Sequence, residues 1–260
     1  MDPFVRTAQE IVDALFREKG DQPAVKRPEP VGKAVVGYLA RIDEDEEPMP
    51  SDIQAFTWAA NQVERRHREG QPIVRLMDGQ ASLWDTATIC WGDRPTIDIL
   101  DIIHVSSYVG SAAKIFHTHR EHQEAYAQDR LLRILEGGVR GVISGMRQQA
   151  TKHGLSAKDR KGIERICGYF EKNRYRMEDD EYLKEGDPIA TGVIEGAYRH
   201  LVMDRLCRTG LRWQGPGRKR CSTSAPYTKP TSANNFTITE PTKNSVEPKN
   251  YGNCSKTTKP

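Results

Sequence analysis

Two short segments rich in β-branched residues constrain the fold of this chain most strongly. The segment QPIVRLMDG predicts a strand over 72–77, and PTIDILDIIHV predicts a second strand over 97–103. The residues between them, including Trp84, are suited to a connecting helix. A strand, a helix and a second strand in this order form a β–α–β unit whose two strands are parallel and buried. The chain is therefore expected to belong to the α/β class.

Capping patterns predict two helices ahead of this unit. Thr7 and Glu10 form a capping box before an apolar stripe, and Ser51 with Gln54 has the spacing to cap a second helix. Residues 20–50 lie between the two helices and combine Pro, Gly and a run of acidic residues, so they are expected to be a linker.

The remainder of the chain divides into a helical part and a polar tail. The pattern from about 105 to 185 predicts four or five helices, one of them capped by Ser156 and Asp159, and a last helix is expected from Thr191 to Gly210. After Trp213 the chain has no Leu, Asp or Trp, so the tail is expected to be disordered. The expected parts are a sheet region at 1–104, an all-helical insertion at 105–186, a further helix of the sheet region, carrying Glu195, at 187–213, and the tail at 214–260.

Composition indicates the cellular compartment more clearly than it indicates the function. The net charge is only +3, from 39 basic and 36 acidic residues, so any basic surface must be local. The five cysteines are scattered without a Cys-x-x-Cys pair, and there is no secretory signal pattern, which favours reduced thiols in a cytoplasmic protein. No apolar run approaches the roughly 20 residues of a membrane span, so a soluble protein without a membrane partner is expected.

Carboxylates at the predicted strand ends are the first candidates for chemistry. Asp78 follows the first strand, and Asp101 with His104 lies at the end of the second. Parallel strands bring such residues to one sheet edge, where α/β proteins place their sites. Glu195, which lies among apolar residues in IATGVIEGAY, could join them from its helix. Clustered carboxylates need a cation between them, and their oxygens suit Mg²⁺ or Mn²⁺.

Each of these residues also has a purely structural interpretation. Asp before Gly is common as a turn residue, so Asp78 could serve the turn alone. Glu195 could favour its helix dipole, and His104 could be a buried histidine with satisfied hydrogen bonds. The run FHTHREH offers His117, His119 and His122, but on a helix the first two would point to different sides, which disfavours a metal site.

Several stretches resemble one known family. VRTAQEIVDALF, IVRLMDGQASLW, ILDIIHV, YFEKNRYRM and above all PIATGVIEGAYRHLVMDRLCRTGLRW are similar to bacterial insertion-sequence transposases of the Kra-type group, which are relatives of the Mutator elements. The resemblance covers the chain from near residue 2 to about 217 and is most specific over 188–213. It implies an RNase H-like sheet, here only partial, with a large all-α insertion before the catalytic Glu.

The resemblance also implies roles for individual residues. Asp78 matches the second catalytic Asp and Glu195 the catalytic Glu, so these two are the expected metal ligands for Mg²⁺ or Mn²⁺. Asp101 and His104 match an Asp-x-x-His motif of the same catalytic region. Two metal ions held in this way activate a water or a DNA 3′-hydroxyl for phosphoryl transfer.

Basic and aromatic residues follow Glu195 on or beside its helix. They are suited to binding phosphates and stacking on bases, although a solvated basic helix end would have the same composition. These expected DNA-binding residues are Arg199, His200, Arg205, Arg208, Arg212 and Trp213.

Two departures from the family pattern shape the expected function. No residue matches the first catalytic Asp, which the family carries upstream of the stretch VRTAQEIVDALF, so the chain resembles an N-terminally truncated enzyme. A two-nucleotide shift of the codons for RKRCSTSAPY can encode AEAMLDLRAI, which is similar to the family ending, so a frameshift near residue 216 is expected.

The expected function is thus a DNA transposase fragment that is inactive alone. Its expected partners are element-end and target DNA and further copies of itself, with no small-molecule substrate, in the cytoplasm at the nucleoid. The alternative is a non-catalytic DNA-binding or interaction protein that modulates an intact transposase.

Overall fold

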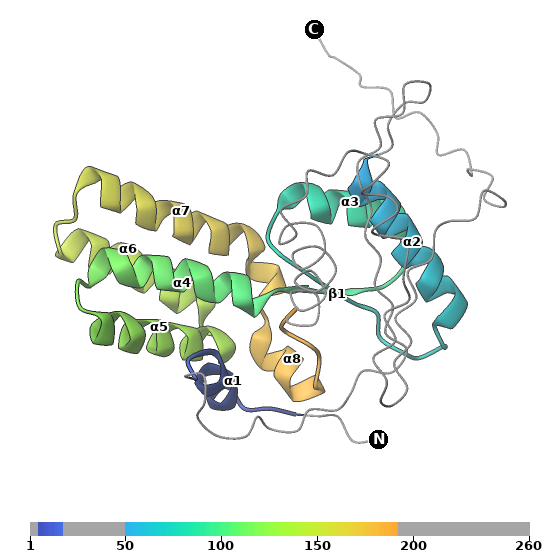
Figure 1. The fold of residues 1–260 in the computed structure, drawn as a ribbon, viewed down its shortest axis with the longest axis horizontal. Helices are drawn as coiled ribbons and strands as arrows, with labels where there is room; N and C mark the ends of the chain where they lie inside the picture. Colours follow the sequence, from blue (N-terminus) through green and yellow to red (C-terminus); the bar gives the residue numbers. More distant parts are fainter. Residues whose placement is uncertain (1–4, 18–49, 192–260) are drawn as a thin grey trace, which may run out of the picture.

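The computed structural model of the chain describes residues 5–17 and 50–191. This part is mostly helical and contains a small parallel sheet of two strands (Figure 1). Most of the predicted linker, the predicted Glu195 helix and the tail at 214–260 lie outside the described residues. Within the described ranges, no helix is long and apolar enough to cross a membrane.

The predicted β–α–β unit is confirmed, but the prediction that both strands are buried is wrong for the first strand, which is half-buried at all four positions. Strands β1 (Val74–Met77) and β2 (Ile97–Leu100) are parallel, with Val74 opposite Ile97, and helix α3 (Ala81–Trp91) connects them. The second strand ends at Leu100, earlier than predicted. Its end comes early because the next residue, Asp101, caps a helix instead of continuing the strand.

Two helices precede the sheet, and only one of their predicted caps is correct. Helix α1 (Ala8–Leu15) has the Thr7–Glu10 capping box, in which each side chain accepts a hydrogen bond from the other residue's backbone N–H. The second predicted helix is present as α2 (Ser51–Arg66), but the predicted Ser51–Gln54 cap is wrong. Pro50 is the N-cap, and its carbonyl accepts from the Gln54 N–H at 3.2 Å, which places Ser51 inside the first turn.

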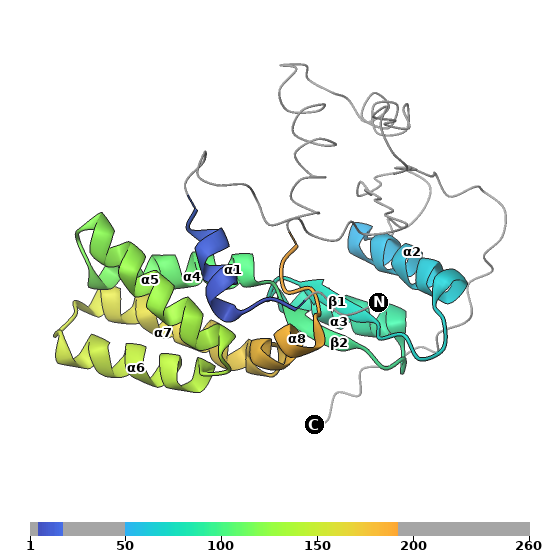
Figure 2. The same cartoon turned by 90° about the horizontal axis from the view of Figure 1, so that it is seen from below.

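The predicted helical block follows the second strand. Figures 1 and 2 show the long helices of this block lying together on one side of the sheet, with α2 and α3 on the other side. The predicted Ser156 cap is confirmed, since its hydroxyl accepts from the Asp159 N–H at 3.1 Å. The elements of the block are α4 (Ile102–Phe116), α5 (Arg120–Leu135), α6 (Val139–Lys152), α7 (Ala157–Asn173), the 3₁₀ turn η1 (Arg174–Arg176) and α8 (Asp179–Glu185).

One apolar core joins the helical block to the sheet. The side chains of β2 and those of α4, α5, α6 and α7 contribute to it, and Ile11 and Val12 of α1 pack against the same core. Burial of these side chains is the main favourable term for the fold. Its largest fully buried members include Ile99, Leu100, Leu131, Ile134, Met146, Ile163 and Phe170.

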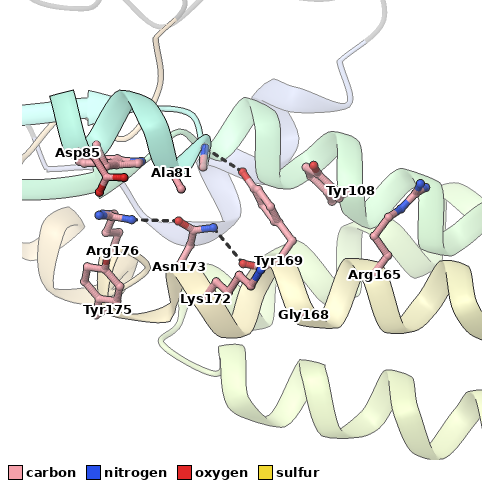
Figure 3. Close-up of a pocket in the computed structure, with 12 residues that line it drawn as sticks. Ala81, Asp85, Tyr108, Arg165, Gly168, Tyr169, Lys172, Asn173, Tyr175 and Arg176 are labelled. Carbon is pink, nitrogen blue, oxygen red and sulfur yellow. Dashed lines mark hydrogen bonds between the residues drawn. The ribbon is translucent and has the colours of Figure 1, made fainter. Parts of the chain in front are cut away.

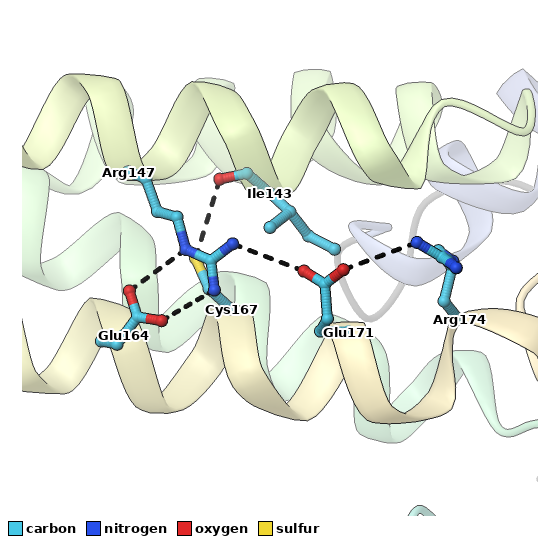
Figure 4. Close-up of polar contacts among 6 residues, drawn as sticks. All are labelled: Ile143, Arg147, Glu164, Cys167, Glu171 and Arg174. Atoms are coloured by element: carbon cyan, nitrogen blue, oxygen red, sulfur yellow. Dashed lines mark hydrogen bonds and ion pairs between the residues drawn. The ribbon is translucent and has the colours of Figure 1, made fainter.

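The outer surface of α6 and α7 carries an ion-pair network (Figure 4). Arg147 donates to both carboxylate oxygens of Glu164, at 2.7 and 3.1 Å, and lies 3.4 Å from Glu171. Glu171 in turn pairs with Arg174 at 3.5 Å. Beneath the network, the Cys167 thiol donates to the carbonyl of Ile143 at 3.8 Å, and burial raises the pKa of this thiol to about 11. Cys167 is therefore a protonated core residue.

Candidate functional site

Asp78 lies directly after β1, at the carboxyl edge of the sheet. Its Oδ1 accepts from the backbone N–H of Gln80 at 2.9 Å, which is the turn role that the sequence left open. Its backbone carbonyl accepts from the indole N–H of Trp84 at 2.6 Å. Within the described residues the second carboxylate oxygen, Oδ2, has no hydrogen-bond partner. Asp78 thus serves the turn and retains one oxygen that could bind a cation.

Asp101 lies beside Asp78 at the same edge but is completely buried. Its backbone N–H donates to the carbonyl of Met77 at 2.9 Å, which continues the parallel pairing by one residue. Its Oδ1 accepts from the Ile103 N–H at 3.0 Å and caps α4. The side chain is 0% exposed, so it has no access to a ligand in solution.

The Asp101 carboxylate also binds the chain that leads toward Glu195. Oδ1 accepts from the backbone N–H of Thr191 at 3.3 Å, and Oδ2 accepts from the Thr191 hydroxyl. A backbone bond of 2.9 Å from Ile102 N–H to the Ile189 carbonyl holds the same segment. This geometry makes Asp101 a positioning residue, while its predicted catalytic role stays a prediction.

His104 lies in the first turn of α4 and is exposed, so the interpretation as a buried histidine is wrong. Glu195 lies four residues beyond Thr191 and is outside the described residues, as are the predicted DNA-binding residues Arg199, His200, Arg205, Arg208, Arg212 and Trp213. Of the predicted catalytic residues, the structure thus brings Asp78 and Asp101 to one sheet edge and places His104 one helical turn further.

The carboxylate oxygens at this edge are only partly suited to binding a metal ion. Asp78 offers one free oxygen, whereas both carboxylate oxygens of Asp101 accept hydrogen bonds from backbone N–H groups or a hydroxyl. Among residues 5–17 and 50–191, no group of three or more His, Cys, Asp or Glu side chains could hold a metal ion. Glu195 would have to supply the second ligand that the resemblance implies.

The histidine run FHTHREH lies at a junction between two helices, contrary to the assumption that it forms one helix. His117 is the C-cap of α4 and His119 is the N-cap of α5. The rings of His117 and His122 are 6.1 Å apart, and partial burial together with His122 and His153 lowers the pKa of His117.

A pocket of about 520 Å³ opens next to the Asp78 turn, between α3, α4, α7 and η1 (Figure 3). A volume of this size is within the range of small-molecule and nucleotide sites. Its lining combines aromatic and basic side chains with a single carboxylate. The lining residues are Gly79, Ala81, Trp84, Asp85, Tyr108, Arg165, Gly168, Tyr169, Lys172, Asn173, Tyr175 and Arg176.

Tyr169 connects the pocket to the predicted catalytic edge. Its hydroxyl accepts from the Gly79 N–H at 3.2 Å, and its ring stacks on Tyr108 with centroids 3.9 Å apart. Burial raises the pKa of Tyr169 to about 12, and Tyr108, Asp78 and Asp101 contribute to the rise. Gly79 is required here, because a Cβ atom at this position would lie 2.5 Å from the Tyr169 ring.

Arg176 organises the other end of the pocket. Its guanidinium lies 3.8 Å from the ring centroid of the buried Trp84 and 4.3 Å from that of Tyr175. It also donates to the Asn173 side-chain oxygen at 3.1 Å. Burial lowers the pKa of Arg176, which nevertheless stays charged at neutral pH. The Tyr175 ring is 60% exposed at the pocket mouth.

Sequence reasoning missed these pocket residues, although two of the stretches that carry the family resemblance supply most of them. IVRLMDGQASLW contributes Gly79 and Trp84, and YFEKNRYRM contributes Tyr169, Lys172 and the Tyr175–Arg176 pair. The available signal was the alternation of basic and aromatic residues in KNRYR. A short run of this kind does not reveal which side chains turn toward the sheet edge.

Comparison with known protein families, with curated proteins and with solved structures finds no match for this chain. The class of protein is therefore inferred from the residues and their geometry.

Proposed function

We propose that the chain is the catalytic-core part of a DDE-type DNA transposase of the Kra-type group, with a partial RNase H-like sheet, and that it is inactive by itself. The observation that carries this proposal is the pairing of Asp101 with Thr191. It binds the beginning of the PIATGVIEG segment to the sheet edge at which Asp78 lies. In the proposed enzyme, Glu195 then reaches the same edge from that segment.

The chemistry assigned to this edge is metal-dependent DNA strand cleavage and transfer. Asp78 and Glu195 would hold Mg²⁺ or Mn²⁺, and such ions activate the attacking oxygen and stabilise the leaving oxygen. Asp101 holds Thr191, which precedes Glu195 by four residues, and Asp78 is oriented by its turn. Inactivity follows because only two of the three required carboxylates are matched, which leaves the second metal ion with too few anionic ligands.

DNA is the proposed partner, both as element ends and as target, and strand transfer between two ends would require a homo-oligomer at the nucleoid. A second candidate function is a non-catalytic DNA-binding protein that modulates an intact transposase. It is favoured by the burial of Asp101, whose carboxylate accepts hydrogen bonds from Ile103 and Thr191 and therefore serves the fold.

A cleavage assay tests the catalytic part of the proposal. The purified chain is incubated with Mg²⁺ or Mn²⁺ and labelled DNA that contains the gene together with the sequences on both sides of it. We expect neither cleavage nor joining. Metal-dependent cleavage that disappears in Glu195→Gln would show that the chain is an active enzyme and would contradict the proposed inactivity.

Manganese binding tests the proposed ligands without requiring activity. We expect weak Mn²⁺ binding, followed by the loss of free-ion electron paramagnetic resonance signal, and weaker binding in Asp78→Asn. Asp93→Asn is a matched control, because Asp93 is exposed after α3 and lies away from the carboxyl edge. Equal affinities of Asp78→Asn and the unmodified chain would refute a metal site at Asp78.

A further inference from the structure

We propose that the pocket between α3, α4, α7 and η1 binds an unpaired nucleotide of single-stranded DNA, with the base stacked on Tyr175 and the backbone phosphates bound by Arg165 and Lys172. This inference rests on the proposed function for the identity of the ligand as DNA. It goes beyond that function because it assigns a binding site outside the carboxylates and outside the basic helix that follows Glu195.

The charge of the pocket fits a phosphate backbone. Arg165, Lys172 and Arg176 line it against one carboxylate, Asp85, so the lining is net positive. Arg165 and Lys172 are exposed, and neither has an ion-pair partner within the described part of the chain. They are two helical turns apart on α7, about 10 Å along its axis, so both can contact one extended strand. Unpaired cations of this kind bind phosphates without a competing carboxylate.

The aromatic side of the pocket fits a base. Tyr175 is the most exposed aromatic residue of the lining. The Arg176 guanidinium contacts both its ring and that of Trp84. Because the Tyr175 ring is oriented before the ligand arrives, little side-chain entropy is lost when a base stacks on it. Figure 3 shows Tyr175 and Arg176 at one end of the pocket and Arg165 at the other, with Lys172 and Tyr169 between them.

The shape of the pocket favours an unpaired strand over a duplex. A base can stack on a side chain only when it has left its own helix, and the pocket of about 520 Å³ can admit a single nucleotide. The pocket also adjoins the Asp78–Gly79 turn through the Tyr169 hydroxyl. A strand bound here would therefore lie beside the proposed catalytic edge, where cleavage requires an accessible phosphate.

Fluorescence anisotropy with the full chain tests this proposal. The probes are a labelled oligothymidylate and a duplex of it with oligodeoxyadenylate, both without divalent metal. We expect tighter binding of the single strand. Loss of one stacked base in Tyr175→Ala should weaken binding about tenfold, whereas Tyr175→Phe keeps the ring and should bind as the unmodified chain does.

The salt dependence of binding tests the two cations separately. Arg165→Gln combined with Lys172→Gln should reduce the slope of log affinity against log salt concentration by roughly 1.4, because each lost phosphate contact on a single strand contributes about 0.7. Arg140→Gln combined with Lys158→Gln is the control. It removes the same charge from exposed positions on α6 and α7 that do not line the pocket.

The outcomes separate this proposal from the proposed function. If DNA binds but the pocket variants lose no more affinity than the control variant, the pocket assignment is wrong and the transposase proposal stands. Preference for the duplex would also overturn the pocket assignment. If the chain binds neither strand form nor its own element ends, both proposals fail.

Discussion

Asp179 should make the stability of the folded chain fall as the pH rises. This residue is the first of α8 and is 1% exposed, and its Oδ1 has no hydrogen-bond partner within the described residues. Burial raises the pKa of Asp179 from its ordinary 3.8 to about 7, and the neighbouring carboxylate of Asp180 adds to the rise. The folded protein therefore retains a proton that the unfolded chain releases.

The sign and size of the effect follow from proton linkage. Below the unfolded pKa both states are protonated and no stability is lost. As the pH rises toward the folded pKa, the unfolded state binds fewer protons than the folded state, so the free energy of unfolding decreases. The full difference between 3.8 and about 7 corresponds to ~4 kcal/mol, at about 1.4 kcal/mol per pH unit. This is a large share of the 5–15 kcal/mol that is typical of a whole domain.

Substitution by a neutral isostere isolates this effect. Asp179→Asn removes the ionisation, so its stability relative to the unmodified chain should increase by ~3 kcal/mol between about pH 5 and about pH 8. Urea unfolding followed by the fluorescence of Trp84 and Trp91 measures both proteins at each pH. Glu181→Gln is the control, because Glu181 lies on the same helix, is exposed and pairs with Lys184 at 2.8 Å. Parallel pH profiles for Asp179→Asn and the unmodified chain would refute the reasoning.

Three further predictions concern packing and surface charge. Gly79→Ala should destabilise the chain by ~1–3 kcal/mol, since the new Cβ would lie 2.5 Å from the Tyr169 ring; a normal urea midpoint would mean that the ring moves freely. Phe170→Ala should cost ~3–5 kcal/mol, because this side chain is fully buried, and thermal unfolding measures the loss. Arg147→Gln should cost less than about 1 kcal/mol, because the ion pair with Glu164 is exposed, and the cost should shrink further in high salt; a larger, salt-independent cost would contradict this.

Local sequence patterns were sufficient to predict most of the secondary structure. The Thr7–Glu10 and Ser156–Asp159 caps form because each needs only residues three positions apart, and the β–α–β unit follows from two β-branched segments around one helical segment. Patterns failed where two local interactions compete. The Asp101 carboxylate, for example, caps a helix at Ile102 and so ends the strand that its apolar neighbours favour.

The candidate site was likewise predicted only in part. Parallel strands end at one edge, so the sequence alone placed Asp78 and Asp101 there. The structure agrees, because Met77 and Leu100, which directly precede them, are opposite each other. The sequence did not show that Asp101 is buried against Thr191, a residue 90 positions later, because nothing in the local pattern distinguishes a ligand from a hydrogen-bonded anchor. A side chain's local spacing determines its element and face, but its chemical role depends on which distant groups occupy its hydrogen bonds.

The pocket was decided by tertiary structure alone. Gly79 and Tyr169 lie 90 residues apart in the chain, and Arg176 reaches across to Trp84 of α3. These contacts form only because the helical block packs α7 against α4 and brings its carboxyl end to the edge of the sheet. Sequence determined which residues are basic, aromatic or helical, since those are properties of short segments. The closure of the chain around a shared core determined which of them meet.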